Sequence, residues 1–156
     1  MPFSTRANRL LAGATPVAVG LLVAGTILLI ATDAGGVLLV LGLFLLVGGV
    51  AAVHSILARR YGGLGFAAFV LTELSFLLIA VYGLGFVTLA AAGPLLALAL
   101  VRMRPRLRLT AAALVAVWPL AVVVAAASPL VFVEAIGTLF AIPYAVLAVE
   151  ALRLQE

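Results

Sequence analysis

Residues 37–58 read VLLVLGLFLLVGGVAAVHSILA, and Arg59 and Arg60 follow at once. These 22 residues contain one ionisable side chain, that of His54. A helix needs about 20 mostly apolar residues to cross the hydrocarbon core of a bilayer. The segment is therefore long and apolar enough to be a transmembrane helix, and the paired arginines mark its end at the membrane surface.

The composition of the rest of the chain agrees with this interpretation. Hydrophobic residues make up 67% of the 156 residues and charged residues 9%, whereas soluble domains are about 45–50% apolar and about 25% charged. One soluble core of this size cannot bury so much apolar surface. We therefore predict an integral, multi-pass protein of the plasma membrane.

Prolines, glycines and arginines divide the chain into helices. Thr15-Pro16 marks either the start of the first helix or a kink within it, since proline suits the first helical position. Similar markers stand at residues 33–36, 59–63, 83–85, 102–108 and 128–129. We predict an all-α bundle, one domain of six transmembrane helices, with approximate bounds 10–32, 37–58, 64–82, 86–101, 109–127 and 129–152.

The arginines predict the orientation of this bundle. Cytoplasmic loops carry an excess of basic residues, and in a six-helix chain with a cytoplasmic N-terminus all nine arginines fall on the cytoplasmic side. A five-helix chain would place either the early or the late arginines on the wrong side. We therefore expect both termini in the cytoplasm. The nine are Arg6, Arg9, Arg59, Arg60, Arg102, Arg104, Arg106, Arg108 and Arg153.

Missing residue types exclude several chemistries. The chain has no cysteine, no lysine and a single histidine, which removes thiolate catalysis, Schiff bases and iron–sulfur clusters. The net charge of +4 comes from arginines in short loops, so we expect no nucleic-acid partner. We predict no cofactor, no metal site and no catalytic residues.

Glu73 stands near the middle of the third predicted helix, nine residues from both Leu64 and Tyr82. At about 1.5 Å per residue, it lies about 14 Å from either membrane surface. A charged acid at that depth costs roughly 3 kcal/mol, so it finds a partner or remains protonated. Glu73 is therefore a candidate proton- or cation-binding site. The alternative is a structural, neutral Glu bonded to a Ser, Thr or Tyr of a neighbouring helix.

Three other ionisable side chains lie in or near the predicted helices. Glu134, near the outer end of the sixth helix, either receives cations from outside or reaches the headgroups. His54, near the inner end of the second, is a proton relay or an interfacial anchor. Because Glu134, His54 and Glu73 stand at outer, inner and middle levels, they do not predict a metal site. Glu150 is expected in solvent, paired with Arg153.

Arginines occupy every second position between the fourth and fifth helices: Arg102, Arg104, Arg106 and Arg108. This spacing is typical of an extended strand on the membrane surface, in which each arginine binds an anionic lipid headgroup and contributes about 1 kcal/mol. The alternative is that the segment only fixes topology.

Small residues are frequent in the predicted helices, for example Gly42, Gly48 and Gly49. Small residues let helix backbones approach closely. They serve packing within one bundle, a homo-oligomer or a larger membrane complex equally well.

Two stretches carry a family resemblance. One is GVLLVLGLFLLVGGV at residues 36–50, followed by Arg59 and Arg60; the other is Ser128-Pro129-Leu130 together with AVEALRL at residues 148–154. They resemble the HdeD-like family of small six-helix membrane proteins linked to acid resistance. They cover under a third of the chain, and the Asn-Pro turns of that family are absent. The resemblance implies a six-helix bundle and a stress-related role, and no catalytic residues.

Taken together, these features predict a non-catalytic membrane component with an accessory, assembly or stress-related role. A small proton- or cation-coupled transporter or channel that uses Glu73 is the alternative. A membrane enzyme has no support, because the sequence holds no acidic pair, His-rich motif or nucleophile motif.

Overall fold

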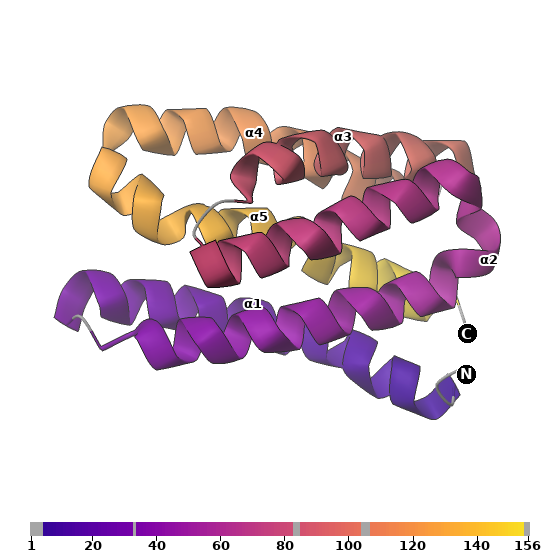
Figure 1. Cartoon of the computed structure of the whole chain (residues 1–156), viewed down its shortest axis with the longest axis horizontal. Helices are drawn as coiled ribbons and strands as arrows, with labels where there is room; N and C mark the ends of the chain where they lie inside the picture. The colour runs from indigo at the N-terminus through magenta and orange to yellow at the C-terminus, as the bar shows by residue number, and fades with distance from the viewer. Residues whose placement is uncertain (1–4, 33, 83–84, 104–106, 155–156) are drawn as a thin grey trace.

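Helices account for almost all of the chain that the computed structural model describes, residues 5–32, 34–82, 85–103 and 107–154. Within these ranges it describes every side chain except those of residues 5, 59–61, 80–82, 86, 87, 90, 103 and 129–135. No strand occurs in these ranges, so the predicted all-α class is confirmed. The helices are α1 (Thr5–Thr32), α2 (Gly36–Tyr82), α3 (Phe86–Met103), α4 (Arg108–Ala127) and α5 (Pro129–Arg153) (Figure 1).

Helix α2 consists of two helices joined end to end at Gly62. This residue has φ 64° and ψ −173°, a conformation that is essentially restricted to glycine. The chain reverses there, so that a first arm (residues 36–61) and a second arm (residues 63–82) run side by side (Figure 1). Counted by arms, the described chain has six helical segments. The break expected between residues 58 and 64 is thus a kink at a single residue.

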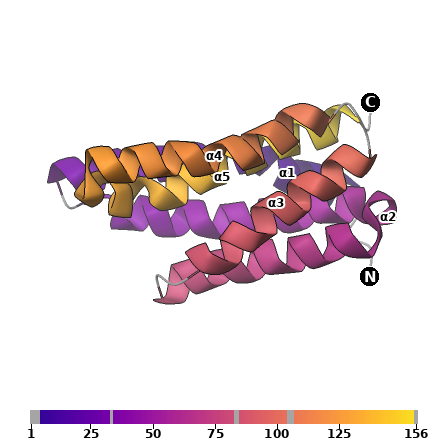
Figure 2. The same ribbon diagram turned by 90° about the horizontal axis from the view of Figure 1, so that it is seen from above.

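The helices form a closed ring of neighbours. Helix α1 packs against α2 and α5, α3 packs against α2 and α4, and α4 packs against α5. Helix α2 also contacts α5 across the ring. Successive segments run in opposite directions, which gives an elongated bundle one helix length long (Figure 2).

Glycines bring α1 and the first arm into close contact. A Cβ on Gly42 would lie 2.8 Å from Cγ of Leu22, and one on Gly49 would meet the hydroxyl of Thr15. Only glycine, which has no side chain, allows the two helix backbones to approach each other this closely. Gly42 and Gly49 therefore serve packing within the bundle, one of the roles expected from the sequence.

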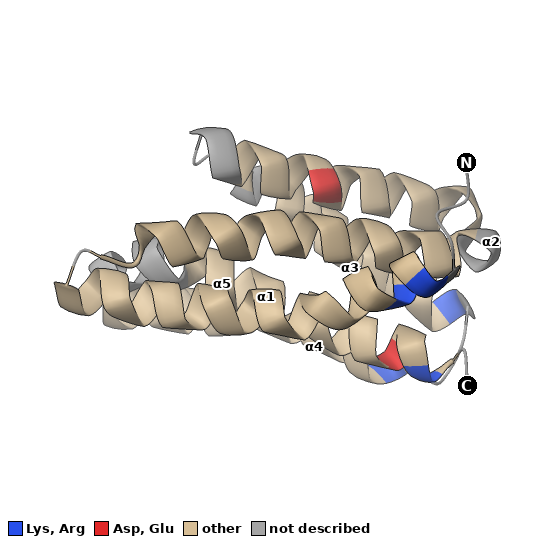
Figure 3. Ribbon diagram, turned by 90° about the horizontal axis from the view of Figure 1, so that it is seen from below, with Lys and Arg blue, Asp and Glu red and all other residues tan. Residues whose placement is uncertain are grey.

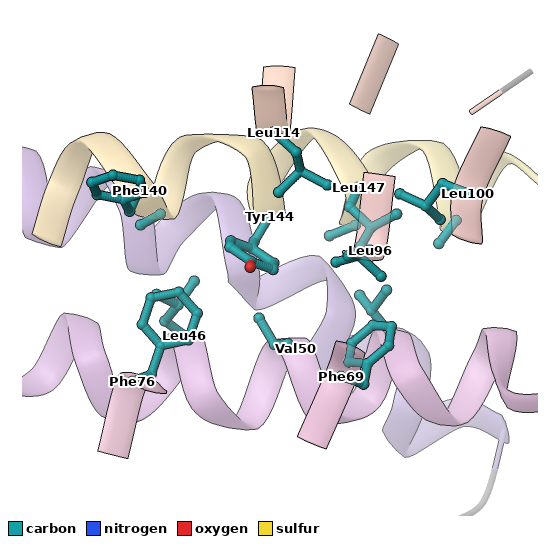
Figure 4. Close-up of a cluster of buried hydrophobic side chains, with 14 of the residues drawn as sticks. Leu46, Val50, Phe69, Phe76, Leu96, Leu100, Leu114, Phe140, Tyr144 and Leu147 are labelled. Carbon is teal, nitrogen blue, oxygen red and sulfur yellow. The ribbon is translucent and has the colours of Figure 1, made fainter. Parts of the chain in front are cut away.

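The core contains buried apolar side chains from all five helices, and Figure 4 shows the part of it that surrounds Tyr144. Tyr144 of α5 is 2% exposed, and its ring meets the edge of Phe76 at a centroid distance of 5.2 Å. Its hydroxyl lies 3.2 Å from Oγ1 of Thr72. Further contacts between helices join Thr26 to Thr138 at 2.8 Å. Small hydroxyl pairs of this kind connect helices whose surfaces are otherwise apolar.

The helix ends agree closely with the turn signals. Helix α1 ends at Thr32, α4 ends at Ala127 and α5 begins at Pro129, as expected for the first, fifth and sixth helices. Helix α1 begins at Thr5, five residues earlier than expected, and Pro16 lies inside it. Pro16 therefore does not start the first helix. A polar first turn is accommodated because it lies beyond the apolar part of the helix.

Five helical segments of the described chain are long and apolar enough to cross a membrane: Arg6–Thr32, Gly36–Ala58, Gly62–Ile79, Arg108–Ala127 and Ile136–Arg153. The apolar stretch found in α3, Ala91–Arg102, is shorter. These lengths indicate a multi-pass membrane protein. Among the described residues, the basic ones gather at one end of the bundle, where α1 begins and α5 ends (Figure 3).

Candidate functional site

A cavity of about 440 Å³ lies between the two arms of α2, and we call it the α2 groove. Its size falls within the range of about 300–1,000 Å³ that is typical of small-molecule sites. Two of the residues singled out in the sequence, His54 and Glu73, line it together. The full lining consists of Ala51, His54 and Ser55 of the first arm and Phe66, Phe69, Val70, Glu73, Leu74 and Leu77 of the second.

The kink at Gly62 determines which residues face each other across the groove. Because the arms run antiparallel from this point, residues equally distant from Gly62 in sequence lie at similar heights. Ala51 and Glu73 each stand eleven residues from Gly62. The smallest side chain of the lining is therefore level with the acidic one, which leaves space beside the carboxyl group.

The groove opens on the outer face of the bundle. Phe66, Val70, Leu74 and Leu77 are 58%, 49%, 45% and 49% exposed, and their spacing of three or four residues places them on one helix face. In a membrane this apolar stripe faces lipid. Glu73, half-buried beside it, is therefore reached sideways from the bilayer and not along the axis of the bundle.

The carboxyl group of Glu73 is not fully hydrogen-bonded within the described chain. Its Oε1 is buried and has no hydrogen-bond partner among the described residues. Tyr144 is close enough to interact with it electrostatically, yet the phenol proton is already used. Thr72 Oγ1 donates its only proton to the carbonyl of Ala68 at 2.9 Å, so the Tyr144 hydroxyl must donate to Thr72. The bond to a neighbouring Ser, Thr or Tyr that a structural Glu73 required is therefore not made by Oε1 within the described chain.

His54 lies against two aromatic rings of the second arm. Its ring centroid is 4.6 Å from that of Phe69 and 5.7 Å from that of Phe66. His54 stands eight residues before Gly62 and Glu73 eleven after it, a height difference of about 5 Å. The two residues therefore stand at different heights, although both line the α2 groove. The folding back of α2 brings them into one groove, within about one helical turn of each other.

The remaining residues singled out in the sequence lie elsewhere. Glu134 belongs to α5, and its side chain is outside the described residues, as are Arg104 and Arg106 altogether. Arg102 in the last turn of α3 and Arg108 at the start of α4 are exposed. The extended, lipid-binding strand between them stays a prediction.

Glu150 forms a polar contact that was not expected from the sequence. Glu150 of α5 is half-buried, and its Oε2 accepts hydrogen bonds from the backbone N–H of Thr110, at 3.3 Å, and from the Thr110 hydroxyl. The expectation of a solvated Glu150 is therefore wrong. The signal was the apolar Leu107 at the start of α4, which offers no side-chain cap and leaves the first N–H groups in need of an acceptor from elsewhere.

The α2 groove combines one carboxyl group, one imidazole, two phenyl rings and apolar walls. The hydroxyl of Ser55 donates to the carbonyl of Ala51 within its own helix, at 3.0 Å. This set can bind a proton or a cation and can hold an apolar molecule. It does not form a nucleophile–base arrangement of the kind that covalent catalysis uses.

Comparison with family models, curated proteins and solved structures finds no match to this chain. A functional assignment therefore depends on the physical properties of its own residues.

Proposed function

We propose that the chain is a plasma-membrane protein with six crossings and both termini in the cytoplasm. Five segments have the necessary length and apolar character. The 18 residues of α3 extend about 27 Å at the α-helical rise, close to the hydrocarbon thickness of about 30 Å. The described basic residues gather at the end where α1 begins and α5 ends (Figure 3), which supports an even number of crossings with that end inside.

Within this topology we propose a non-catalytic role as an accessory or assembly component that acts in the plane of the bilayer. The observation that carries this proposal is that the links between successive helices are short. Between Thr5 and Arg153, at most four residues separate one helix from the next. Helix surfaces are then almost all that this part of the chain offers to a partner, and partners that bind them must also be in the membrane. A stress-related role of the HdeD-like kind remains a prediction that fits this picture.

Native mass spectrometry of the chain, released from its own membranes in lipid nanodiscs, tests this role. We expect a complex of defined stoichiometry with another membrane protein. Removing the chain from cells should reduce the amount of that complex. If the chain is found only as monomers or homo-oligomers, and its removal leaves every membrane complex at its normal level, the accessory role is wrong.

A second function, proton- or cation-coupled transport, is favoured by one observation. Glu73 Oε1 is buried without a partner in the described chain, at mid-depth and beside an open groove. Natural proteins retain such costly groups in membranes mainly at ion and substrate sites. In proteoliposomes with an internal pH dye, transport predicts a proton flux that Glu73→Gln abolishes. An absence of flux under proton, Na⁺ and K⁺ gradients excludes this function.

A further inference from the structure

The α2 groove has a polarity pattern that selects one class of ligand. Its walls are apolar, and its open side is the exposed stripe that starts at Phe66. A ligand must therefore be lipophilic enough to reach the groove through the bilayer. Lipid headgroups are unsuitable, because they stay at the membrane surface while Glu73 lies about 14 Å or more below it.

The carboxyl group of Glu73 determines the charge of that ligand. The ionised form is unfavourable in a membrane unless a positive charge lies beside it. Ca²⁺ does not fit, since it takes six to eight oxygen ligands and the lining side chains supply oxygen only from Glu73 and Ser55. The hydroxyl of Ser55 also donates to a backbone carbonyl within its own helix. A weakly hydrated organic cation needs no such oxygen shell.

Aromatic side chains complete the site. Phe69 lines the groove about one helical turn from Glu73, and Phe66 lines it about two turns away. The faces of aromatic rings attract organic cations within about 6 Å of the ring centroid. The space for such a cation lies level with Ala51, whose methyl group is the smallest side chain of the lining.

We infer that the α2 groove is a binding site for lipophilic organic cations, in which the carboxylate of Glu73 balances the charge and Phe66 and Phe69 contact the apolar substituents. The ligand class is a quaternary ammonium or phosphonium ion that carries aromatic or alkyl groups. This inference goes beyond the proposed function, because such binding requires neither an accessory role nor transport.

Tetraphenylphosphonium is the probe that tests the inference. The full chain is placed in nanodiscs of phosphatidylcholine, and binding is measured by equilibrium dialysis with empty nanodiscs subtracted. We expect saturable binding at one site per chain. Tetraphenylborate has the same shape and the opposite charge, and it should not compete. Absent saturable binding, or equal competition by tetraphenylborate, would overturn the inference.

Two pairs of variants locate the site. Glu73→Gln should weaken tetraphenylphosphonium binding at least tenfold, whereas Glu150→Gln, which removes a carboxylate outside the groove, should leave it within twofold. Ala51→Leu keeps the acid but fills the groove, and it should also weaken binding at least tenfold. Its control, Ala67→Leu, enlarges an exposed alanine of the second arm that is not part of the lining.

These variants also keep the inference testable if one of them fails to fold. Size-exclusion chromatography identifies a misfolded variant, and the other pair then decides. Unchanged affinity in a folded Glu73→Gln or Ala51→Leu chain shows that the probe binds elsewhere, which rejects the site. The loss of tetraphenylphosphonium binding does not bear on whether the chain forms complexes with other membrane proteins. The binding test and the test of the accessory role can therefore fail independently of each other.

Discussion

Glu150 caps helix α4, whose third residue, Thr110, lies forty residues before it in the chain. Its Oε2 accepts the backbone N–H of Thr110 at 3.3 Å as well as the hydroxyl of the same residue. Thr110 is the third residue of α4, whose N-cap residue Leu107 forms no side-chain bond. A carboxylate at this position satisfies an otherwise orphaned N–H and interacts favourably with the positive end of the helix dipole. This contact fastens the end of α5 to the start of α4.

Removing this cap should destabilise the fold measurably. Glu150→Ala leaves the N–H and the hydroxyl of Thr110 without their acceptor, and we expect a loss of about 1–3 kcal/mol in the free energy of unfolding. Glu150→Gln keeps one acceptor oxygen and should lose less. The control is Arg153→Gln, an exposed change one turn away, which should stay within about 0.5 kcal/mol. Denaturation in mixed micelles, followed by circular dichroism, measures all three; equal effects at Glu150 and Arg153 would contradict the cap.

The kink of α2 should depend on the backbone of Gly62 alone. A Cβ at Gly62 would contact nothing within 4 Å, and the same is true of Gly63. The two glycines differ in conformation, because only Gly62 has a positive φ. We expect Gly62→Ala to cost about 1–3 kcal/mol of stability through backbone strain. Gly63→Ala should be neutral or slightly stabilising, since alanine favours a helix. Similar losses at both positions would show that the turn does not need the left-handed conformation.

Single cysteines should report six crossings. Ala34 and Ala127 are exposed near the ends of helices away from the charged end, whereas Gly63 and Arg153 are exposed near the charged end. Cysteines at the first two positions should react with a membrane-impermeant maleimide on whole cells. Cysteines at the last two should react only after the cells are permeabilised, because basic ends remain in the cytoplasm. Labelling of Arg153→Cys on intact cells would refute the six-crossing topology.

The helices could be predicted from the sequence because particular residues mark their ends. The Gly-rich turn before α2 and Ser128-Pro129 before α5 stand within a few residues of the observed ends. The start of α1 was misplaced because Pro16 suits both the first turn of a helix and a position inside a membrane helix. A loop was expected around Gly62 in place of the observed kink, because glycine is common both in loops and at helix kinks.

Only part of the candidate site could be predicted from the sequence. Glu73 and His54 each stood out as rare ionisable groups in apolar segments, and both line the α2 groove. That they share a site was not predictable, because helices that are apolar on every side carry no periodic signal of which face meets which neighbour. The same limit hid the bond between Glu150 and Thr110, since it depends on the packing of α4 beside α5.

Glu73 and Thr72 should respond in opposite ways to the loss of their polar groups. Thr72 is fully buried, and its hydroxyl accepts from Tyr144 while it donates to a backbone carbonyl. Thr72→Val keeps the shape but leaves the Tyr144 hydroxyl unpaired, so we expect a loss of about 1–3 kcal/mol. At Glu73, Oε1 is buried without a partner in the described chain. Replacing a buried, unsatisfied polar group by an apolar one of similar size removes a desolvation cost.

Glu73→Leu should therefore raise the free energy of unfolding by about 1–2 kcal/mol, as expected where a group is kept for function at the expense of stability. Glu73→Gln, which keeps a polar group in the same place, should change stability little. Denaturant titration of both variants beside Thr72→Val, in the same micelles, provides the comparison. A destabilised Glu73→Leu protein would mean that the carboxyl group supports the fold, and the structural role of Glu73 would then be the correct one. A stabilised protein that has also lost tetraphenylphosphonium binding would identify Glu73 as a binding residue whose carboxyl group the fold does not need.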